Sequence, residues 1–320
     1  MKLISISRRK AFEKLLERLR QNGAGKAVTC YENVWCFCLP EKEYKAHAEL
    51  FRSFGAHVES DVKVRLHAKE IVPWGIKKMG APDLWKTTTG NEIKVAVIDT
   101  GISRRHPDLR GQVKGGIDFI KGAGKPSDSR GHGTHVAGTI AALLNGRGVV
   151  GMAPRASLYD IRAFYPDGTA DLRTIIAGIN WAVANRMDVI NMSFGIEENS
   201  PALHAAIKRA AAAGIYLVAS AGNNGGALEY PARYPEVIAV GAIDKQGKLA
   251  SFSSRGRGMD VAAPGVNIYS TWPGGKYRSL DGTSMAAAHI SGMTALQLAS
   301  KNRKVSARRI KHYLRRSLPA

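Results

Sequence analysis

Five segments with a strand pattern alternate with helical patterns from residue 93 onward, and this alternation constrains the fold more than any other feature. The first of them, Ile93–Ile98, is a continuous apolar strand, which is typical of a strand buried on both faces in a parallel sheet. Repeated strand–helix alternation predicts an α/β domain with a doubly wound, mostly parallel sheet and helices on both faces. The predicted strands span 93–98, 157–162, 189–193, 215–220 and 237–242, and the predicted helices span 132–144, 172–185, 201–213 and 283–298.

Residues 1–68 have a different pattern, which predicts a small α+β domain of the split βαβ, ferredoxin-like kind. The domain organisation we expect is therefore 1–68 followed by 69–320, with a linker at 66–73. In the first domain we expect strands at 3–6 and 57–65, a hairpin formed by 27–30 and 34–39, and helices near 11–19 and at 42–55.

Composition excludes several classes of protein. Of the 320 residues, 44% are apolar, which is enough to build a core and excludes disorder of the whole chain. No apolar run approaches the roughly 20 residues of a membrane-spanning helix. Cys30, Cys36 and Cys38 match no usual zinc spacing, and we interpret them as small buried hydrophobic residues.

The net charge of +21 favours anionic partners such as nucleic acid or a membrane surface. No acidic residue occurs from residue 301 onward, so the C-terminal stretch is the most basic part. Because no aromatic-interleaved basic motif of a nucleic-acid reader is present, we predict no specific nucleic-acid binding. We expect a monomer. The first ten residues lack the apolar segment of a secretion signal, so the chain is cytoplasmic as written, or extracellular if its true start lies upstream.

Three polar residues lie at the ends of predicted apolar strands or helices, close to glycines. Asp99 follows the strand predicted at 93–98, His132 opens one predicted helix, and Ser284 opens another. A serine hydroxyl alone is a weak nucleophile. It needs a neutral imidazole to take its proton and a carboxylate to hold the imidazole in one tautomer. Asp99 by itself would more often be a turn or capping residue, but the three together supply this chemical set.

Asn223 directly follows the strand predicted at 215–220. Its amide is placed to donate a hydrogen bond to a developing oxyanion. The backbone N–H of Ser284, at a helix N-terminus, is the second donor that we expect.

Five ordered motifs resemble those of subtilisin-type serine proteases, the subtilase family. They are Val-Ile-Asp-Thr-Gly-Ile at 97–102, His-Gly-Thr-His-Val-Ala-Gly at 132–138, Asn-Met-Ser-Phe-Gly at 191–195, Ala-Gly-Asn at 221–223 and Gly-Thr-Ser-Met-Ala at 282–286. The resemblance covers about residues 71–300. It implies a serine endopeptidase that acts on polypeptides, with Asp99, His132 and Ser284 as the catalytic triad and Asn223 as the oxyanion donor. His106, His135 and His289 are expected to be structural.

Residues 1–68 resemble the inhibitory propeptide of that family. The resemblance implies an intramolecular chaperone and inhibitor, which makes the chain a self-processed zymogen. By the same alignment the cut falls near Ala68 and Lys69, just ahead of Ile71.

The resemblance also implies where a substrate binds. Gly168 and the segment Ser193, Phe194 and Gly195 correspond to two stretches that pair with substrate backbone as an added strand. Ser220, Ala221 and Gly222 correspond to one wall of the pocket for the side chain before the cut. Glu229 falls where residues at the base of that pocket occur. It either confers a preference for Lys or Arg, or points to solvent or pairs with Arg233.

A calcium site is a further implication of the resemblance. The loop 143–149 corresponds to the family's calcium loop, and an oxygen-rich cage suits a hard cation such as Ca²⁺. Arg147 would contribute only its carbonyl, and its positive charge opposes cation binding. The ligands implied are Glu70, the carboxylate of Asp108, the side chain of Asn145 and the carbonyls of Leu143, Arg147 and Val149.

Two other classes of function remain as alternatives. A catalytically silent module with this fold could bind anionic partners through the basic C-terminal tail. A serine esterase is the other, but no Gly-x-Ser-x-Gly elbow surrounds Ser284.

Overall fold

The computed structural model describes residues 1–23, 27–62, 69–120, 128–301 and 310–312. The chain divides into two compact units, residues 1–67 and 68–320. Residues 66–68 of the expected linker lie outside the described residues, and so does Ala68 of the expected cutting site.

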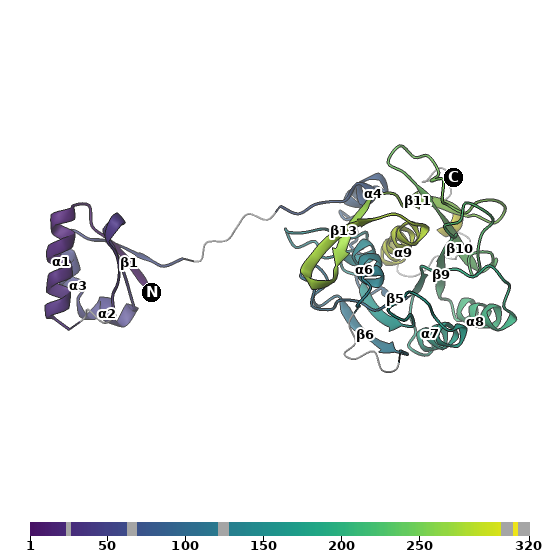
Figure 1. The fold of residues 1–320 in the computed structure, drawn as a ribbon, viewed down its shortest axis with the longest axis horizontal. Helices are drawn as coiled ribbons and strands as arrows, with labels where there is room; N and C mark the ends of the chain where they lie inside the picture. The colour runs from purple at the N-terminus through teal and green to yellow at the C-terminus, as the bar shows by residue number, and fades with distance from the viewer. Residues whose placement is uncertain (24–26, 63–68, 121–127, 302–309, 313–320) are drawn as a thin grey trace. The chain divides into compact units, whose positions relative to one another are not determined.

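The first unit is a four-stranded antiparallel sheet with three helices (Figure 1). The strand order is β2-β3-β1-β4, and the chain order β1-α1-β2-β3-α2-α3-β4 is that of a split βαβ fold. Apolar side chains of α1, such as Phe12 and Leu15, pack on Ile4 and Phe37 of the sheet. The elements are β1 Lys2–Ser5, α1 Arg9–Gln21, β2 Thr29–Tyr31, β3 Cys36–Leu39, α2 Glu41–Ala46, α3 Ala48–Ser53 and β4 His57–Ser60.

Two details of this unit differ from the prediction. The helix expected at 42–55 is two short helices, because His47 leaves the helical conformation with φ −122° and ψ 17°. The strand expected at 57–65 ends at Ser60, and residues 63–65 are not described. Cys30, Cys36 and Cys38 are free thiols, of which only Cys38 is fully buried.

The second unit is built on a seven-stranded sheet in which every pair of neighbours is parallel (Figure 1). Its strand order, β11-β10-β9-β8-β5-β7-β6, confirms the doubly wound α/β fold. The strands are β5 Lys94–Asp99, β6 Val113–Asp118, β7 Ser157–Arg162, β8 Val189–Met192, β9 Tyr216–Ser220, β10 Val237–Ile243 and β11 Val261–Pro264. The helices are α4 Trp74–Lys78, α5 Ala81–Leu84, α6 His132–Ala141, α7 Leu172–Ala184, α8 Pro201–Ala212 and α9 Thr283–Ser300.

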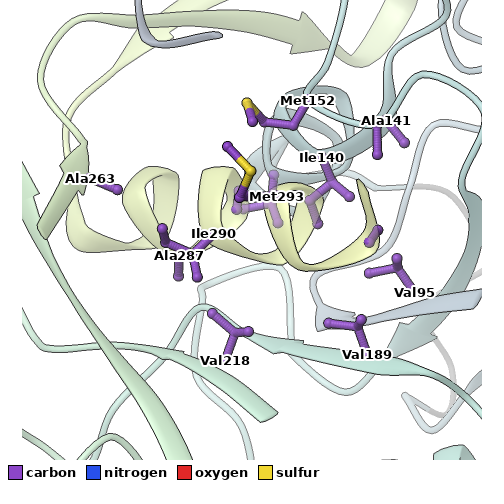
Figure 2. Close-up of a cluster of buried hydrophobic side chains, with 14 of the residues drawn as sticks. Val95, Ile140, Ala141, Met152, Val189, Val218, Ala263, Ala287, Ile290 and Met293 are labelled. Atoms are coloured by element: carbon purple, nitrogen blue, oxygen red, sulfur yellow. The ribbon is translucent and has the colours of Figure 1, made fainter. Parts of the chain in front are cut away.

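Both faces of the central strand β5 are buried, as its continuous apolar sequence predicts. Val95 and Val97 pack in the core formed with α6 and α9, whereas Ala96 and Ile98 pack in the core formed with α7 and α8. Figure 2 shows the first core, in which Ile290 and Met293 of α9 lie among side chains of the sheet and of α6.

The helices α6 and α9 pack directly on each other at Gly292. A Cβ at this position would overlap Met152 and would lie 3.0 Å from the carbonyl oxygen of Ile140. Glycine therefore allows the close approach of the two helices. This contact matters for the site because His132 begins α6 and Ser284 stands in the first turn of α9.

Several elements were not predicted. Both edge strands of the central sheet, β6 and β11, are among them, and β6 contains Gly115 and Gly116, which weaken a strand pattern. The antiparallel hairpin β12 Ile268–Trp272 and β13 Lys276–Leu280 lies beside α6 and was also missed. Within the described residues, no helix has the length and apolar character needed to cross a membrane.

Candidate active site

Asp99 and His132 meet at the carboxyl end of β5. The Nδ1–H of His132 donates to both carboxylate oxygens of Asp99, at 2.8 and 2.9 Å. Because a carboxylate only accepts, this contact fixes the tautomer and leaves Nε2 of the neutral imidazole free to accept a proton. Asp99 is buried, and its Oδ1 also accepts from the backbone N–H of Thr100.

Two neighbouring residues fix the start of α6, which carries His132. A Cβ at Gly133 would overlap the carbonyl oxygen of Gly101 and crowd Asp99, so glycine allows α6 to approach the end of β5. The buried Asp128 accepts from the N–H groups of Gly131 and Thr134, at 2.7 and 2.8 Å. Its carboxylate thus satisfies N–H groups that the first turn leaves unpaired. Asp128 was not predicted as a site residue, although an acidic residue just before a helix is a recognisable start signal.

Ser284 lies in the first turn of α9 and is held at the end of β8. Its hydroxyl donates to the carbonyl oxygen of Ser193 at 3.1 Å, and no hydrogen bond joins it to His132 among the described residues. The Ser193 hydroxyl donates back to the carbonyl oxygen of Ser284 at 3.1 Å. Asn191 extends this buried network, since its amide donates to the Ser193 hydroxyl and its Oδ1 accepts from Ser291.

Asn223 presents its amide N–H₂ beside the start of α9. Its Oδ1 accepts from both the N–H and the hydroxyl of Thr283, at 2.9 Å each, which orients Nδ2 as the free donor. A Cβ on Gly282 would lie 3.7 Å from this Nδ2 and 3.8 Å from the backbone N of Ser284. Glycine therefore leaves a gap beside two N–H donors, which is the arrangement that stabilises an oxyanion.

A cavity of about 300 Å³ opens beside the Asp99–His132 pair. Four of its lining residues were predicted to bind substrate, namely Gly168, Ser193, Phe194 and Gly195. Sequence reasoning missed three others, which are Thr100, Arg130 and Phe164.

The predicted wall of the substrate pocket, Ser220 to Gly222 at the end of β9, lies close to Phe194 and Gly195. The Ser220 hydroxyl donates to the carbonyl oxygen of Phe194 at 3.5 Å, and the N–H of Glu229 donates to the carbonyl oxygen of Ala221 at 2.9 Å. The half-buried carboxylate of Glu229 stands between Gly195 and Gly222, since a Cβ on either glycine would overlap it.

Glu229 makes no ion pair with any described residue. The guanidinium of Arg233 instead lies 4.9 Å from the ring centroid of Tyr230. Burial, and then the negative charge of Glu197, raise the pKa of Glu229. A carboxylate in such surroundings gains stability from a cation brought close to it.

The predicted ligands Glu70 and Asp108 both contact the loop of residues 143–149. Asp108 is fully buried, and its carboxylate accepts from the N–H of Val149, the amide of Asn145 and the hydroxyl of Tyr277. Glu70 accepts from the N–H groups of Asn145 and Gly146, at 2.8 and 3.0 Å.

The carbonyl oxygens of Leu143, Arg147 and Val149 accept no hydrogen bond from a described residue. Unpaired carbonyls beside a buried carboxylate that has only neutral partners form an oxygen set that fits Ca²⁺. No cluster of three or more His, Cys, Asp or Glu side chains suited to a metal occurs in the described part of the chain. The predicted calcium set contains two carboxylates, those of Glu70 and Asp108, and its other ligands are amide and carbonyl oxygens.

The electrostatics of His132 combine opposing effects. Burial lowers its pKa, but the negative charge and hydrogen bond of Asp99 raise it by more, and the net shift is upward. The folded protein therefore stabilises the imidazolium. His135 and His289, which are fully buried without a carboxylate partner, have pKa values lowered by burial to about 4.

Comparisons with known proteins agree with this geometry. A model of the subtilase family matches residues 90–319. The M-protease of Shouchella clausii (strain KSM-K16) is 45% identical over 262 residues, which are 81% of this chain and 68% of that protein. Subtilisin Savinase of Lederbergia lenta is 46% identical over 246 residues, 76% of this chain and 90% of the relative. Subtilisin E of Bacillus subtilis (strain 168) is 48% identical over 251 residues, which are 76% of this chain and 65% of that protein.

The chain belongs to the subtilase family, as its motifs predicted. It is a serine-type endopeptidase.

The pKa of His132 gives a direct test of its contact with Asp99. In the wild type, the NMR titration midpoint of His132 should lie above the ordinary value of about 6.5. In Asp99→Asn it should fall, because burial and the charge of Arg130 lower the pKa and only the charge of Asp128 still opposes them. The stability that the contact provides is fully present below about pH 6.5 and is lost as pH rises through the folded pKa.

His135 is the internal control for this titration. It should stay neutral between pH 5 and 8 in both proteins, because its pKa is about 4. An unchanged His132 midpoint in Asp99→Asn would contradict the assignment.

Proposed function

We propose that this endopeptidase is made as a self-processed zymogen and cleaves polypeptides through an acyl-enzyme on Ser284. His132 serves as the general base and then the general acid, and Asp99 orients it. The observation that carries the proposal is the hydrogen-bonded pair of buried Asp99 and half-buried His132, which lines one cavity with Ser193, the residue that holds the Ser284 hydroxyl. Beside Ser284, Gly282 leaves a gap near two N–H donors.

The reaction begins when the Ser284 hydroxyl turns from the Ser193 carbonyl toward Nε2 of His132, by rotation about Cα–Cβ. Catalytic hydrogen bonds are often formed only in the substrate complex. The hydroxyl oxygen then attacks the peptide carbonyl carbon while its proton passes to His132. The amide of Asn223 and the N–H of Ser284 hold the oxyanion.

Collapse of this intermediate breaks the C–N bond, and His132 gives its proton to the leaving amine. Water then repeats the sequence on the ester bond and releases the carboxylic acid product and the free Ser284 hydroxyl. Asp99 remains ionised throughout, and holds the Nδ1–H so that Nε2 faces the reacting atoms.

Residues 1–68 act in this proposal as an inhibitory propeptide, which is cut from the catalytic unit between Ala68 and Lys69. The division of the chain into units at 67/68 supports a boundary here. Backbone pairing of the second unit begins just beyond, where the N–H of Ile71 donates to the carbonyl oxygen of Gly148 at 2.7 Å.

Substitution of Ser284 tests catalysis and processing together. Ser284→Ala should lack measurable casein digestion and fluorophosphonate labelling, and should remain full length. The wild type should be labelled and should start at Lys69 by N-terminal sequencing. Asn223→Ala should lower kcat roughly 10²–10³-fold, as loss of one oxyanion donor does.

Ser300→Ala is the matched control, because it removes an exposed hydroxyl at the other end of the same helix. A wild type that resists labelling and spares casein would favour a catalytically silent binding module. Rapid hydrolysis of short esters without cleavage of casein would favour an esterase.

The substrate residue before the cut is proposed to be Lys or Arg, which would contact Glu229. The support is the half-buried position of this carboxylate between Gly195 and Gly222 and the absence of a cationic partner among the described residues. The nearby charge of Glu197 adds to the attraction for a cation.

Glu229→Gln should lower the preference for an Arg-ended over a Phe-ended peptide about tenfold in kcat/KM, because the variant loses a partly buried opposite charge. Glu198→Gln, at an exposed position nearby, should leave this preference unchanged. Equal wild-type rates on the two peptides would overturn the assignment.

Calcium is proposed to bind the loop of residues 143–149 together with Asp108 and Glu70. Its role would be structural: the ion would hold this loop and the segment at Ile71, which pairs with the loop. The positive charge of Arg147 limits the affinity.

Calcium at about 100 times its Kd should raise Tm by about 5–10 °C, because binding to the native state alone then contributes about 2.7 kcal/mol. EDTA should reverse the rise, and Mg²⁺ should not replace Ca²⁺ in a flexible cage of this kind. Asn145→Ala should weaken the calcium response. Identical melting temperatures in EDTA and in calcium would exclude the site.

A further inference from the structure

Arg130 is a charged group of the cleft that the mechanism does not use. It lines the cavity beside His132 together with Gly168 and Ser193. Its side chain is exposed, and it stands two residues before the catalytic imidazole.

The position of the guanidinium is fixed. Its Nη1 donates to the carbonyl oxygens of Pro166 and Asp167. A Cβ on Gly168 would lie 2.6 Å from Cζ and 2.9 Å from both Nε and Nη2. Gly168, with φ +91°, therefore provides the space in which the guanidinium lies flat against the backbone.

The remaining N–H groups of Arg130, on Nε and Nη2, donate to no described residue. Asp167 is an exposed acidic group whose pKa is lowered first by its hydrogen bonds from the N–H and hydroxyl of Thr169 and then by the charge of Arg130. Asp99 and Asp128 are buried and bonded elsewhere. The guanidinium of Arg130 thus gives the cavity a positively charged wall, and its Nε and Nη2 donate no hydrogen bond to a described residue.

Side chains alternate along an extended substrate, so the guanidinium of Arg130 faces one particular substrate residue. Successive side chains of a strand point to opposite sides. When the residue before the cut points toward Glu229, the preceding residue points away from it and toward the cavity lined by His132 and Arg130.

We propose that Arg130 is a specificity-determining residue that favours Asp or Glu, and rejects Lys or Arg, at the second substrate residue before the cut. This inference rests on the proposed function. Together with Glu229 it gives a cleft of alternating charge, negative for the first residue before the cut and positive for the second. Consecutive basic residues are then poor substrates, because the second cation meets the guanidinium.

The experiment uses three peptides that differ only at the second residue before the cut, which is Glu, Gln or Lys. All three carry the same first residue, so the contribution of Glu229 cancels. The wild type should prefer Glu over Lys by about fivefold or more in kcat/KM, which is the scale of an exposed charge interaction. The ratio should approach one when salt rises from about 0.05 to 0.5 M, because screening shortens the reach of charge.

Substitutions of Arg130 distinguish the effect of its charge from its role in holding the backbone of Pro166 and Asp167. Arg130→Lys keeps the charge and should keep the preference, whereas Arg130→Gln should reduce the Glu-to-Lys ratio to about one. Both variants disturb the contacts with Pro166 and Asp167, so a purely structural role would change the rates on all three peptides equally. Arg209→Gln, an exposed position on α8 outside the cavity lining, is the control for net charge.

A wild-type ratio near one, or a ratio that survives in Arg130→Gln or in high salt, overturns the proposal. Failure of the proposed function looks different. In that case the Gln peptide is not cleaved at all, or Ser284→Ala cleaves it as well as the wild type does, and this inference fails with it.

Discussion

The close packing of α6 on α9 is the constraint on which the site depends. His132 and Ser284 lie 152 positions apart in the chain, but each stands in the first turn of one of these helices. Gly292 lets the two helices touch, and the network of Asn191 and Ser193 ties the start of α9 to the end of β8. The relative position of base and nucleophile is therefore a property of helix and sheet packing.

The sequence predicted five of the seven strands of the central sheet, β5, β7, β8, β9 and β10, because buried parallel strands tend to be apolar. It missed the two edge strands β6 and β11. β5 is an example, with both faces covered. The edge strand β6 was missed because Gly115 and Gly116 interrupt the pattern, and a Cβ on Gly116 would overlap the backbone of Asp160 in β7. The split of the predicted second helix at His47 depends on a local backbone conformation that helical periodicity does not reveal.

The predicted site residues came from motifs, whose spacing gives identity but not orientation. The contact of Asp99 with His132 has the expected form, whereas the hydroxyl of Ser284 is bonded to Ser193. Asp128 was missed although its contacts with Gly131 and Thr134 are local. Arg130 contacts Pro166 and Asp167, far along the chain, and periodicity gave no signal for those contacts. The net charge of +21 likewise did not predict the local charge of the cleft, where the Glu229 carboxylate has no cationic partner among the described residues.

The pairing of Ile71 with residues 148 and 150 has a consequence for the fate of the chain after a cut at the proposed place. Only Lys69 and Glu70 would precede the first backbone hydrogen bond, and the Glu70 carboxylate is itself bonded to the loop. An N-terminus held this close to its first backbone hydrogen bond frays little. It is therefore a poor substrate for aminopeptidases, which act on free extended N-termini.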